Sequence, residues 1–217
     1  MKALSSKEGV PARKVLSKDN LIIKGIPVSY VGYTLKDFKA STEKFNFYRT
    51  YLENLHSMYK DRVCIFQTGA NGTGKTLLAS LVVKEGYRLR YNTYMTTLAS
   101  YISLLFKANK SFEEEKLLRY IKNCDFLVLD EVGKENFTST KSNINVLEEL
   151  LRTATQTGQV IIINTNLVLK DFEELYGASI TSLIKGDFTI LKFKGEDYRP
   201  VVKRNSSREL LARALKC

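Results

Sequence analysis

The chain has 217 residues, of which 44% are hydrophobic, and its formal net charge at pH 7 is +11. This length suits one α/β domain with a sizeable core, or one such domain with short extensions. No apolar run approaches the roughly 20 residues of a membrane span, and residues 1–20 lack the apolar centre of a signal peptide. We therefore expect a cytoplasmic protein without a membrane segment.

The positive charge is concentrated at the two ends of the chain. Residues 1–24 carry six Lys or Arg against two Asp or Glu, and residues 185–217 carry nine against four. Basic ends suit a phosphate-rich partner such as nucleic acid, although they also serve simple solubility. Residues 1–24 show turn residues and little periodicity, so we interpret them as a flexible basic arm.

Cysteine and histidine give no sign of a metal or redox site. The three cysteines at positions 64, 124 and 217 are scattered, and their spacing fits neither a disulfide framework nor a zinc site. The single histidine, His56, lies on a predicted amphipathic helix, where we interpret it as an ordinary surface residue.

The elements before the first strand follow from simple patterns. Residues 25–27 begin a turn, and residues 33–38 are expected to pack on the edge of the domain. Aromatic and leucine side chains then recur at helical spacing, which predicts a helix over about 44–60. The apolar run at 63–67 predicts a short strand that leads into a glycine-rich stretch.

This stretch reads GANGTGKT and matches the phosphate-binding pattern G-x-x-x-x-G-K-[ST] at every fixed position. Glycines allow successive backbone N–H groups to point at phosphate oxygens, and the following helix presents its positive end to the same anion. Lys75 is placed to reach the β and γ phosphates of ATP, and the Thr76 hydroxyl to hold Mg²⁺. The predicted nucleotide-binding residues are Gly69, Ala70, Asn71, Gly72, Thr73, Gly74, Lys75, Thr76 and Leu77.

The middle of the chain alternates between helical and strand patterns. Leucines at helical spacing predict a helix over 77–84 that Gly86 ends. Residues 89–93 are a possible second strand, after which Thr96 or Thr97 caps a helix. Residues 112–122 predict another helix, after a polar break at 107–111.

The second half of the site follows the buried run Phe-Leu-Val-Leu at 126–129. Continuous apolar residues predict a strand buried on both faces of a parallel sheet, and Asp130 and Glu131 stand at its carboxyl end. Asp130 is predicted to hold Mg²⁺, directly or through water, and Glu131 to orient or deprotonate the attacking water. A polar loop at 134–142 and a further helix come next.

A second buried strand is predicted at 160–163, and it ends in Asn164-Thr165-Asn166. An amide at this position reaches toward the γ-phosphate and the water, and Asn166 is the first choice, with Asn164 the second. Short helical patterns follow at 170–176 and 180–184, and a last strand at 189–193. Ser206 and Glu209 have capping-box spacing, which predicts a basic C-terminal helix within 201–217.

Strands that alternate with helices predict an α/β fold, with three layers and a central parallel sheet. The segments GIPVSYVGYTLKDF, LDEVGKENFTS, IIINTNL and LKFKGEDYR, in this order, resemble the AAA+ ATPases of the DnaC/DnaI helicase-loader type and the related IstB-like transposition ATPases. The resemblance covers about residues 25–200. It implies an ATP-controlled replication protein that binds a hexameric replicative helicase and single-stranded DNA and helps to load the helicase.

The resemblance also implies roles for arginines, and two of these positions differ here. Arg199 matches the late arginine that senses the nucleotide within the same subunit. Leu183 stands at the apparent place of an arginine finger, where Lys185 is a weaker substitute, and Ala154 stands at a second expected arginine, with Arg152 nearby. We therefore expect weak ATP hydrolysis by the protein alone.

The chain is short for a full helical lid domain and for a folded helicase-binding domain. Residues 1–24 are therefore the expected helicase contact, and such a compact form would suit a phage or mobile element. Three alternatives stay open: an IstB-like transposition regulator that assembles as a homo-oligomer on DNA, a small P-loop kinase, and a nucleotide-gated inhibitory protein. Candidate DNA contacts, besides the arm, are Lys107, Lys110, Lys203, Arg204 and Arg208.

Overall fold

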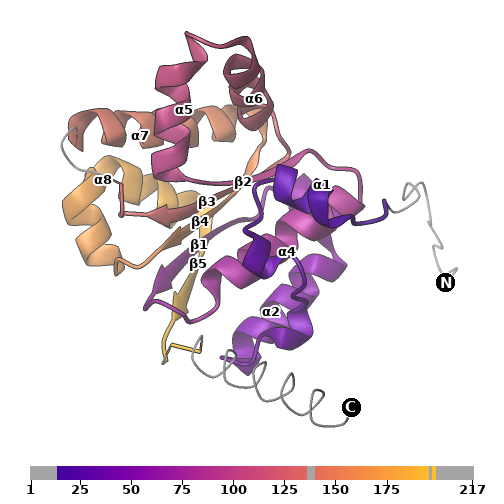
Figure 1. Cartoon of the computed structure of the whole chain (residues 1–217). Coiled ribbons are helices and arrows are strands. Elements are labelled where there is room, and N and C mark those ends of the chain that lie inside the picture. The colour runs from indigo at the N-terminus through magenta and orange to yellow at the C-terminus, as the bar shows by residue number, and fades with distance from the viewer. Residues whose placement is uncertain (1–13, 136–139, 196, 199–217) are drawn as a thin grey trace, which may run out of the picture.

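The computed structural model describes residues 14–135, 140–195 and 197–198, and these residues form a central sheet between two layers of helices (Figure 1). Five strands pair in the order β2-β3-β4-β1-β5, and all four pairings are parallel. The predicted α/β architecture is thus confirmed. The strands are β1 (Cys64–Gly69), β2 (Thr93–Thr97), β3 (Phe126–Val132), β4 (Val160–Thr165) and β5 (Phe188–Phe193).

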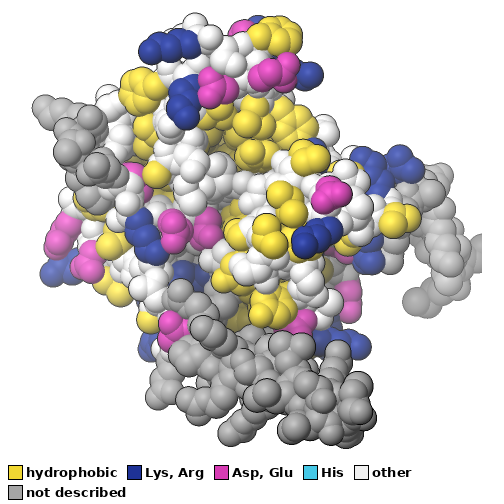
Figure 2. All heavy atoms as spheres, in the orientation of Figure 1, with side chains coloured by type: hydrophobic (Ala, Val, Ile, Leu, Met, Phe, Trp, Pro, Cys, Tyr) yellow, Lys and Arg dark blue, Asp and Glu magenta, His cyan; other side chains and the backbone are white. Residues whose placement is uncertain are grey.

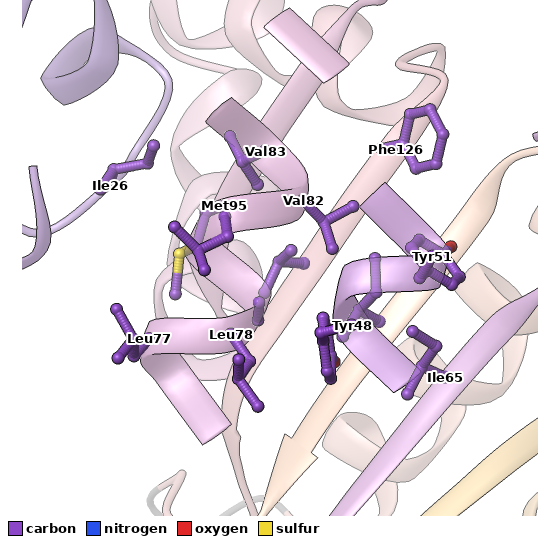
Figure 3. Close-up of a cluster of buried hydrophobic side chains, with 14 of the residues drawn as sticks. Ile26, Tyr48, Tyr51, Ile65, Leu77, Leu78, Val82, Val83, Met95 and Phe126 are labelled. Carbon is purple, nitrogen blue, oxygen red and sulfur yellow. The ribbon is translucent and has the colours of Figure 1, made fainter. Parts of the chain in front are cut away.

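The helices divide between the two faces of the sheet. The face with α2 and α4 carries one hydrophobic cluster, and Figure 3 shows side chains from these helices and from β1 and β3 pointing into that common space. The other face carries the second cluster, beneath α5, α7 and α8. The helices are α1 (Lys18–Ile23), α2 (Thr42–Glu53), α3 (Leu55–Lys60), α4 (Lys75–Arg88), α5 (Leu98–Ala108), α6 (Phe112–Lys122), α7 (Thr140–Thr157) and α8 (Leu169–Asp187), with 3-10 turns η1 (Val28–Tyr30) and η2 (Leu35–Asp37).

The two central strands, β3 and β4, are buried on both faces, as their continuous apolar sequences predict. Val128 and Ile162 belong to the cluster under α4, whereas Leu129 and Ile163 belong to the cluster on the opposite face. Because successive strand residues alternate between faces, the next residues, Asp130 and Asn164, point to the α4 side. This alternation brings polar groups of two strands together below the phosphate loop.

Several predicted elements differ in their bounds. Helix α4 continues through Gly86, which was expected to end it, and the short helices expected at 170–176 and 180–184 form one helix, α8, with a kink at Gly177. The strand expected at 89–93 is found at Thr93–Thr97, because α4 continues to Arg88 and the next residues wind back, with Tyr91 N donating to Gly86 O at 2.9 Å. The helix expected over 44–60 is divided into α2 and α3 at Asn54, whose side-chain Nδ2 donates to Thr50 O at 2.9 Å. Thr97 caps α5, as one of the two predicted candidates, by accepting from Ser100 N.

The basic arm expected over 1–24 is partly built into the domain, which corrects that expectation for residues 14–24. Ser17 accepts a hydrogen bond from Asn20 N as the N-cap of α1, and Leu21 is buried in the core. Lys14 N donates to Arg88 O at 2.9 Å. Residues 1–13 and the helix expected within 201–217 lie outside the described residues.

The segment before α2 is held against α4 by a buried lysine. Lys84 Nζ donates to Tyr30 O at 2.6 Å and to Tyr33 O at 2.7 Å, and burial lowers the pKa of this ammonium to about 8. The same segment places the Phe38 ring directly on Gly74, where an added Cβ would lie 2.6 Å from the ring. An aromatic side chain thus supports the phosphate loop from outside.

Among the described residues, no helix has the length and apolar character needed to cross a membrane.

Candidate nucleotide-binding site

The loop between β1 and α4 is shaped by three glycines with positive φ angles: +133° at Gly69, +70° at Gly72 and +95° at Gly74. Gly74 is also the N-cap of α4, and Thr73 Oγ1 donates to Ala70 O at 2.8 Å across the loop. A loop of this kind at a helix N-terminus turns backbone N–H groups toward one side and so forms an anion-binding cradle. The conformation therefore fits the predicted phosphate site.

Lys75 lies within this loop. Its Nζ donates to Gly69 O at 2.6 Å and to Ala70 O at 2.7 Å, and the residue is buried. The ammonium charge is therefore held inside the cradle, where it adds to the positive end of α4. Asn71 is exposed at the tip of the loop, whereas Leu77 is buried in the core.

The acidic strand end lies beside the loop. Asp130 Oδ1 accepts from Thr76 Oγ1 at 3.4 Å, from Asn164 Nδ2 at 2.9 Å and from Glu131 N at 3.0 Å. Burial raises the pKa of the Asp130 carboxyl, and these hydrogen bonds oppose that effect. The phosphate loop and the acidic residue, far apart in the sequence, thus meet at one point.

The oxygen atoms at this point fit Mg²⁺. Within the described residues every hydrogen bond to the Asp130 carboxylate goes to Oδ1, so Oδ2 remains available as a ligand. The Thr76 hydroxyl adjoins it, and carboxylate and hydroxyl oxygens are the hard ligands that Mg²⁺ prefers together with substrate phosphates and water.

Glu131 occupies a strained position. Its φ is +56°, which is rare for a side chain of this size, and the pairing of β3 with β4 shifts register between Leu129 and Val132. Bulges of this kind often aim a side chain at a functional site. The half-exposed Glu131 carboxylate accepts from Lys134 Nζ at 2.8 Å, a partner that sequence reasoning missed.

The two asparagines at the end of β4 have different environments. Asn164 is buried and bonded to Asp130, whereas Asn166 lies one residue beyond the strand and is half-buried. The turn that carries Asn166 is fixed by Leu167, whose N donates to Thr165 Oγ1 and whose carbonyl accepts from Thr68 Oγ1. Among the described residues no hydrogen bond joins Asn166 to the carboxylates, and its role stays a prediction.

The chain after β5 returns to the phosphate loop. Tyr198 N donates to Gly72 O at 3.1 Å, and a Cβ added at Gly72 would lie 1.8 Å from Asp197 Oδ1. Arg199 itself lies outside the described residues, so its predicted role is untested. Nothing in the sequence pattern pointed to the contact between Asp197 and the loop.

A buried carboxyl links the region after β3 to α8. Glu135 accepts from Gly133 N at 2.9 Å and from the Tyr176 hydroxyl, and burial raises the pKa of this carboxyl. Tyr176 precedes Gly177, where α8 is kinked by a non-helical φ of 87°. A glutamate after a polar turn carries no sequence signal of burial, so this link was not predicted.

The position expected for an arginine finger faces inward. Leu183 packs against the hydrophobic cluster under α8, and Lys185 is paired with Glu173 on the same helix at 3.1 Å. Arg152 is held by Glu148 at 2.7 Å. Neither cation is directed to the phosphate loop of its own subunit by these contacts.

A cleft of about 760 Å³ opens beside Thr73. Its walls come from the residues that enter α2, including Ala40 and Ser41, and from the end of β5, including Phe193. This volume falls within the usual range of small-molecule sites.

The sheet order, the phosphate loop after β1 and the acidic residues at the end of β3 together define a P-loop NTPase fold of the AAA+ type. The family model of the IstB-like ATP binding proteins matches residues 39–206, and the chain belongs to this family.

The relatives and solved structures to which the chain is similar include replication proteins. The chain is 26% identical over 160 residues to the replicative helicase loader DnaC of Buchnera aphidicola subsp. Baizongia pistaciae (strain Bp), a match that spans 70% of this chain and 63% of that protein, less than two thirds of its length. A crystal structure of the DnaC helicase loader superposes with a TM-score of 0.66 at 19% identity, covering 76% of this chain and 99% of that one. A structure of the replication initiator DnaA bound to AMPPCP and single-stranded DNA superposes with a TM-score of 0.62 at 20% identity, covering 76% of this chain and 50% of that one. These structural likenesses support the fold.

Proposed function

We propose that the protein is an ATP-controlled helicase loader, which binds a hexameric replicative helicase and single-stranded DNA. The proposed dependence on ATP rests on one observation: the phosphate loop that holds Lys75 lies beside Asp130. The Thr76 hydroxyl and the Asp130 carboxylate are 3.4 Å apart. Membership in an ATP-binding family and similarity to DnaC support the loading role.

In this proposal each residue has a separate task. The loop and Lys75 bind the phosphates of ATP, and the cleft beside Thr73 takes the base and ribose. Thr76 and Asp130 would hold Mg²⁺, which neutralises phosphate charge when it is bound. Glu131 orients the attacking water and accepts its proton, and Asn166 and Arg199 sense the γ-phosphate.

The role of Glu131 can be tested by Glu131→Gln. We expect ATP hydrolysis to fall by about 100-fold, because the amide cannot accept a proton, while ATP binding stays within twofold of the wild type. Single-turnover hydrolysis and calorimetric binding measure the two effects. Glu174→Gln, which alters a surface pair with Lys170, is the control and should leave hydrolysis unchanged. Equal hydrolysis by both variants would remove Glu131 from the mechanism.

The loading role is tested by native mass spectrometry of the protein with a candidate replicative helicase. Adding ATP should increase the fraction of protein in the complex. The Glu131→Gln variant should increase it further, since it holds ATP without turnover. Absence of a complex in every nucleotide state would contradict the loader proposal. ATP-dependent filaments on duplex DNA would instead favour the transposition regulator. Phosphate transfer to a small acceptor would favour the kinase.

A nucleotide-gated, weakly hydrolysing protein is the second candidate. The inward Leu183 and the paired Lys185 favour it, because neither residue offers an unpaired cation to a neighbour's ATP. Turnover that stays at background with helicase and DNA present would support this candidate over an active ATPase.

For single-stranded DNA, the α5–α6 hairpin is the proposed contact. Phe106 and Phe112 are 64% and 74% exposed near its outer end, beside the exposed Lys107 and Lys110. Figure 2 shows basic, acidic and hydrophobic side chains together at this end of the molecule. Aromatic rings with adjacent cations stack on bases and neutralise phosphates, and a base–aromatic stack contributes about 1–3 kcal/mol.

Phe106→Ala combined with Phe112→Ala is expected to weaken binding of a single-stranded oligonucleotide by about 10-fold without changing its salt dependence. Fluorescence anisotropy at several salt concentrations measures both quantities. Val28→Ala, at another exposed apolar residue, is the matched control. Unchanged affinity of the double variant would place the DNA contact elsewhere.

A further inference from the structure

Gln67 of β1 has an environment that the proposed reaction does not explain. Its side chain is fully buried, and neither Nε2 nor Oε1 has a hydrogen-bond partner. Within the described part of the chain, five buried side-chain polar atoms lack partners, and three of them belong to Gln67 and Asn164. Buried polar groups are nearly always paired, so this concentration at two neighbouring residues requires a reason.

The two amides are neighbours in the sheet. Gln67 is the direct partner of Asn164 in the parallel pairing of β1 with β4. Adjacent strands lie about 4.8 Å apart, and two residues earlier on each strand Ile65 and Ile162 both belong to the cluster under α4. Gln67 and Asn164 therefore project from the same face, within reach of one hydrogen bond or of one bridging water.

Only one of the two polar atoms of the Asn164 side-chain amide has a hydrogen-bond partner. Its Nδ2 donates to Asp130 Oδ1 at 2.9 Å, whereas its Oδ1 is an unpaired acceptor. The Gln67 Nε2, on the neighbouring strand, is a donor that likewise has no partner. An amide held at both ends cannot rotate, so its Nδ2 would stay on Asp130 Oδ1 and leave Oδ2 directed to the metal position.

We propose that Gln67 is a positioning residue: one internal water, or a rotation of the Gln67 side chain, joins its Nε2 to Asn164 Oδ1 and thereby fixes Asn164 on Asp130. The row Gln67–Asn164–Asp130 runs across three adjacent strands below the phosphate loop. Leaving a buried amide unpaired destabilises the folded state, and an apolar side chain of similar size would avoid that cost. The metal part of the inference rests on the proposed ATP site, whereas the hydrogen bond between the amides does not.

The hydrogen bond is tested without nucleotide or metal by a double-mutant cycle. Urea unfolding is measured for Gln67→Leu, Asn164→Ala and both together. We expect the double variant to lose clearly less unfolding free energy than the sum of the single losses. The control cycle pairs Asn164→Ala with Gln159→Leu, because Gln159 is a buried glutamine bonded instead to Ile121 O and Cys124 O. Additive losses in both cycles would overturn the proposal.

The positioning role is tested by Mg²⁺ affinity, which a purely structural role would not change. Mg²⁺ is titrated into the full-length protein saturated with a fluorescent ATP analogue. Gln67→Leu is expected to weaken Mg²⁺ binding by about 10-fold, as is usual for residues behind a metal ligand, and to leave metal-free nucleotide binding within twofold. Mg²⁺ affinity within twofold of the wild type would overturn the positioning role. Failure of the wild type to bind the analogue would overturn the proposed function instead, and the double-mutant cycle would still decide the amide bond.

Discussion

Replacement of Lys75 by alanine is expected to lower the affinity for ATP by about 100-fold. The Lys75 ammonium is held inside the loop by Gly69 O at 2.6 Å and Ala70 O at 2.7 Å, so it lies where the phosphates bind. Hydrogen bonds to charged groups contribute about 1.5–3 kcal/mol each, and a lysine that bridges two phosphates makes more than one. Calorimetric titration of ATP at fixed Mg²⁺ measures the loss.

Two controls separate this loss from unfolding or from general charge. Lys170→Ala removes a lysine whose side chain is 85% exposed, and its ATP affinity should stay within twofold of the wild type. Thermal unfolding of Lys75→Ala shows whether the loop depends on the two carbonyl bonds for stability. If the well-folded Lys75→Ala variant binds ATP like the wild type, the phosphate loop is not the ATP site.

A large loss of stability is expected for Gly69→Ala, at about 3 kcal/mol. The φ of Gly69 is +133°, and an added Cβ would lie 1.9 Å from the backbone oxygen of Phe193 on the neighbouring strand β5. Backbone atoms cannot move aside as a flexible side chain does, so β1 and β5 would have to separate at the edge of the phosphate loop. Urea unfolding measures the change.

Two further glycines separate the clash from the φ angle. Gly177 has a φ of +87° with nothing within 4 Å of an added Cβ, so Gly177→Ala should cost about 1 kcal/mol from backbone strain alone. Gly186 lies near the end of α8 in open space, and Gly186→Ala should stabilise the protein by about 0.5–1 kcal/mol. A Gly69→Ala variant as stable as Gly177→Ala would show that β5 does not press on the loop.

Those parts of the fold that depend on local pattern were predictable. The apolar runs of β3 and β4 allow few alternatives to buried parallel strands, and the loop motif fixes the strand before it and the helix after it. The meeting of Thr76 with Asp130 then follows from parallel topology, because the carboxyl ends of the strands share one edge.

Other features depend on contacts between distant segments, which sequence spacing does not encode. Asn164 and Asn166 are two residues apart, so alternation along a strand does not distinguish them. Asn164 lies beside Asp130 because β4 ends at Thr165 and pairs with β3 in this register. The start of β2 depends on how far α4 extends. The folding of residues 14–24 onto the domain depends on the burial of Leu21. Gln67 could have been noticed as a polar residue within an apolar strand, but its neighbour Asn164 becomes evident only from the pairing.

The hydrogen bond from Tyr198 N to Gly72 O has a practical consequence for labelled forms of the protein. A dye attached at residue 198 would lie close to Gly72 of the phosphate loop, so its fluorescence is expected to change when a nucleotide binds there. The same closeness makes this position a poor site for a bulky fusion, because a rigid attachment would crowd the loop before any ligand entered.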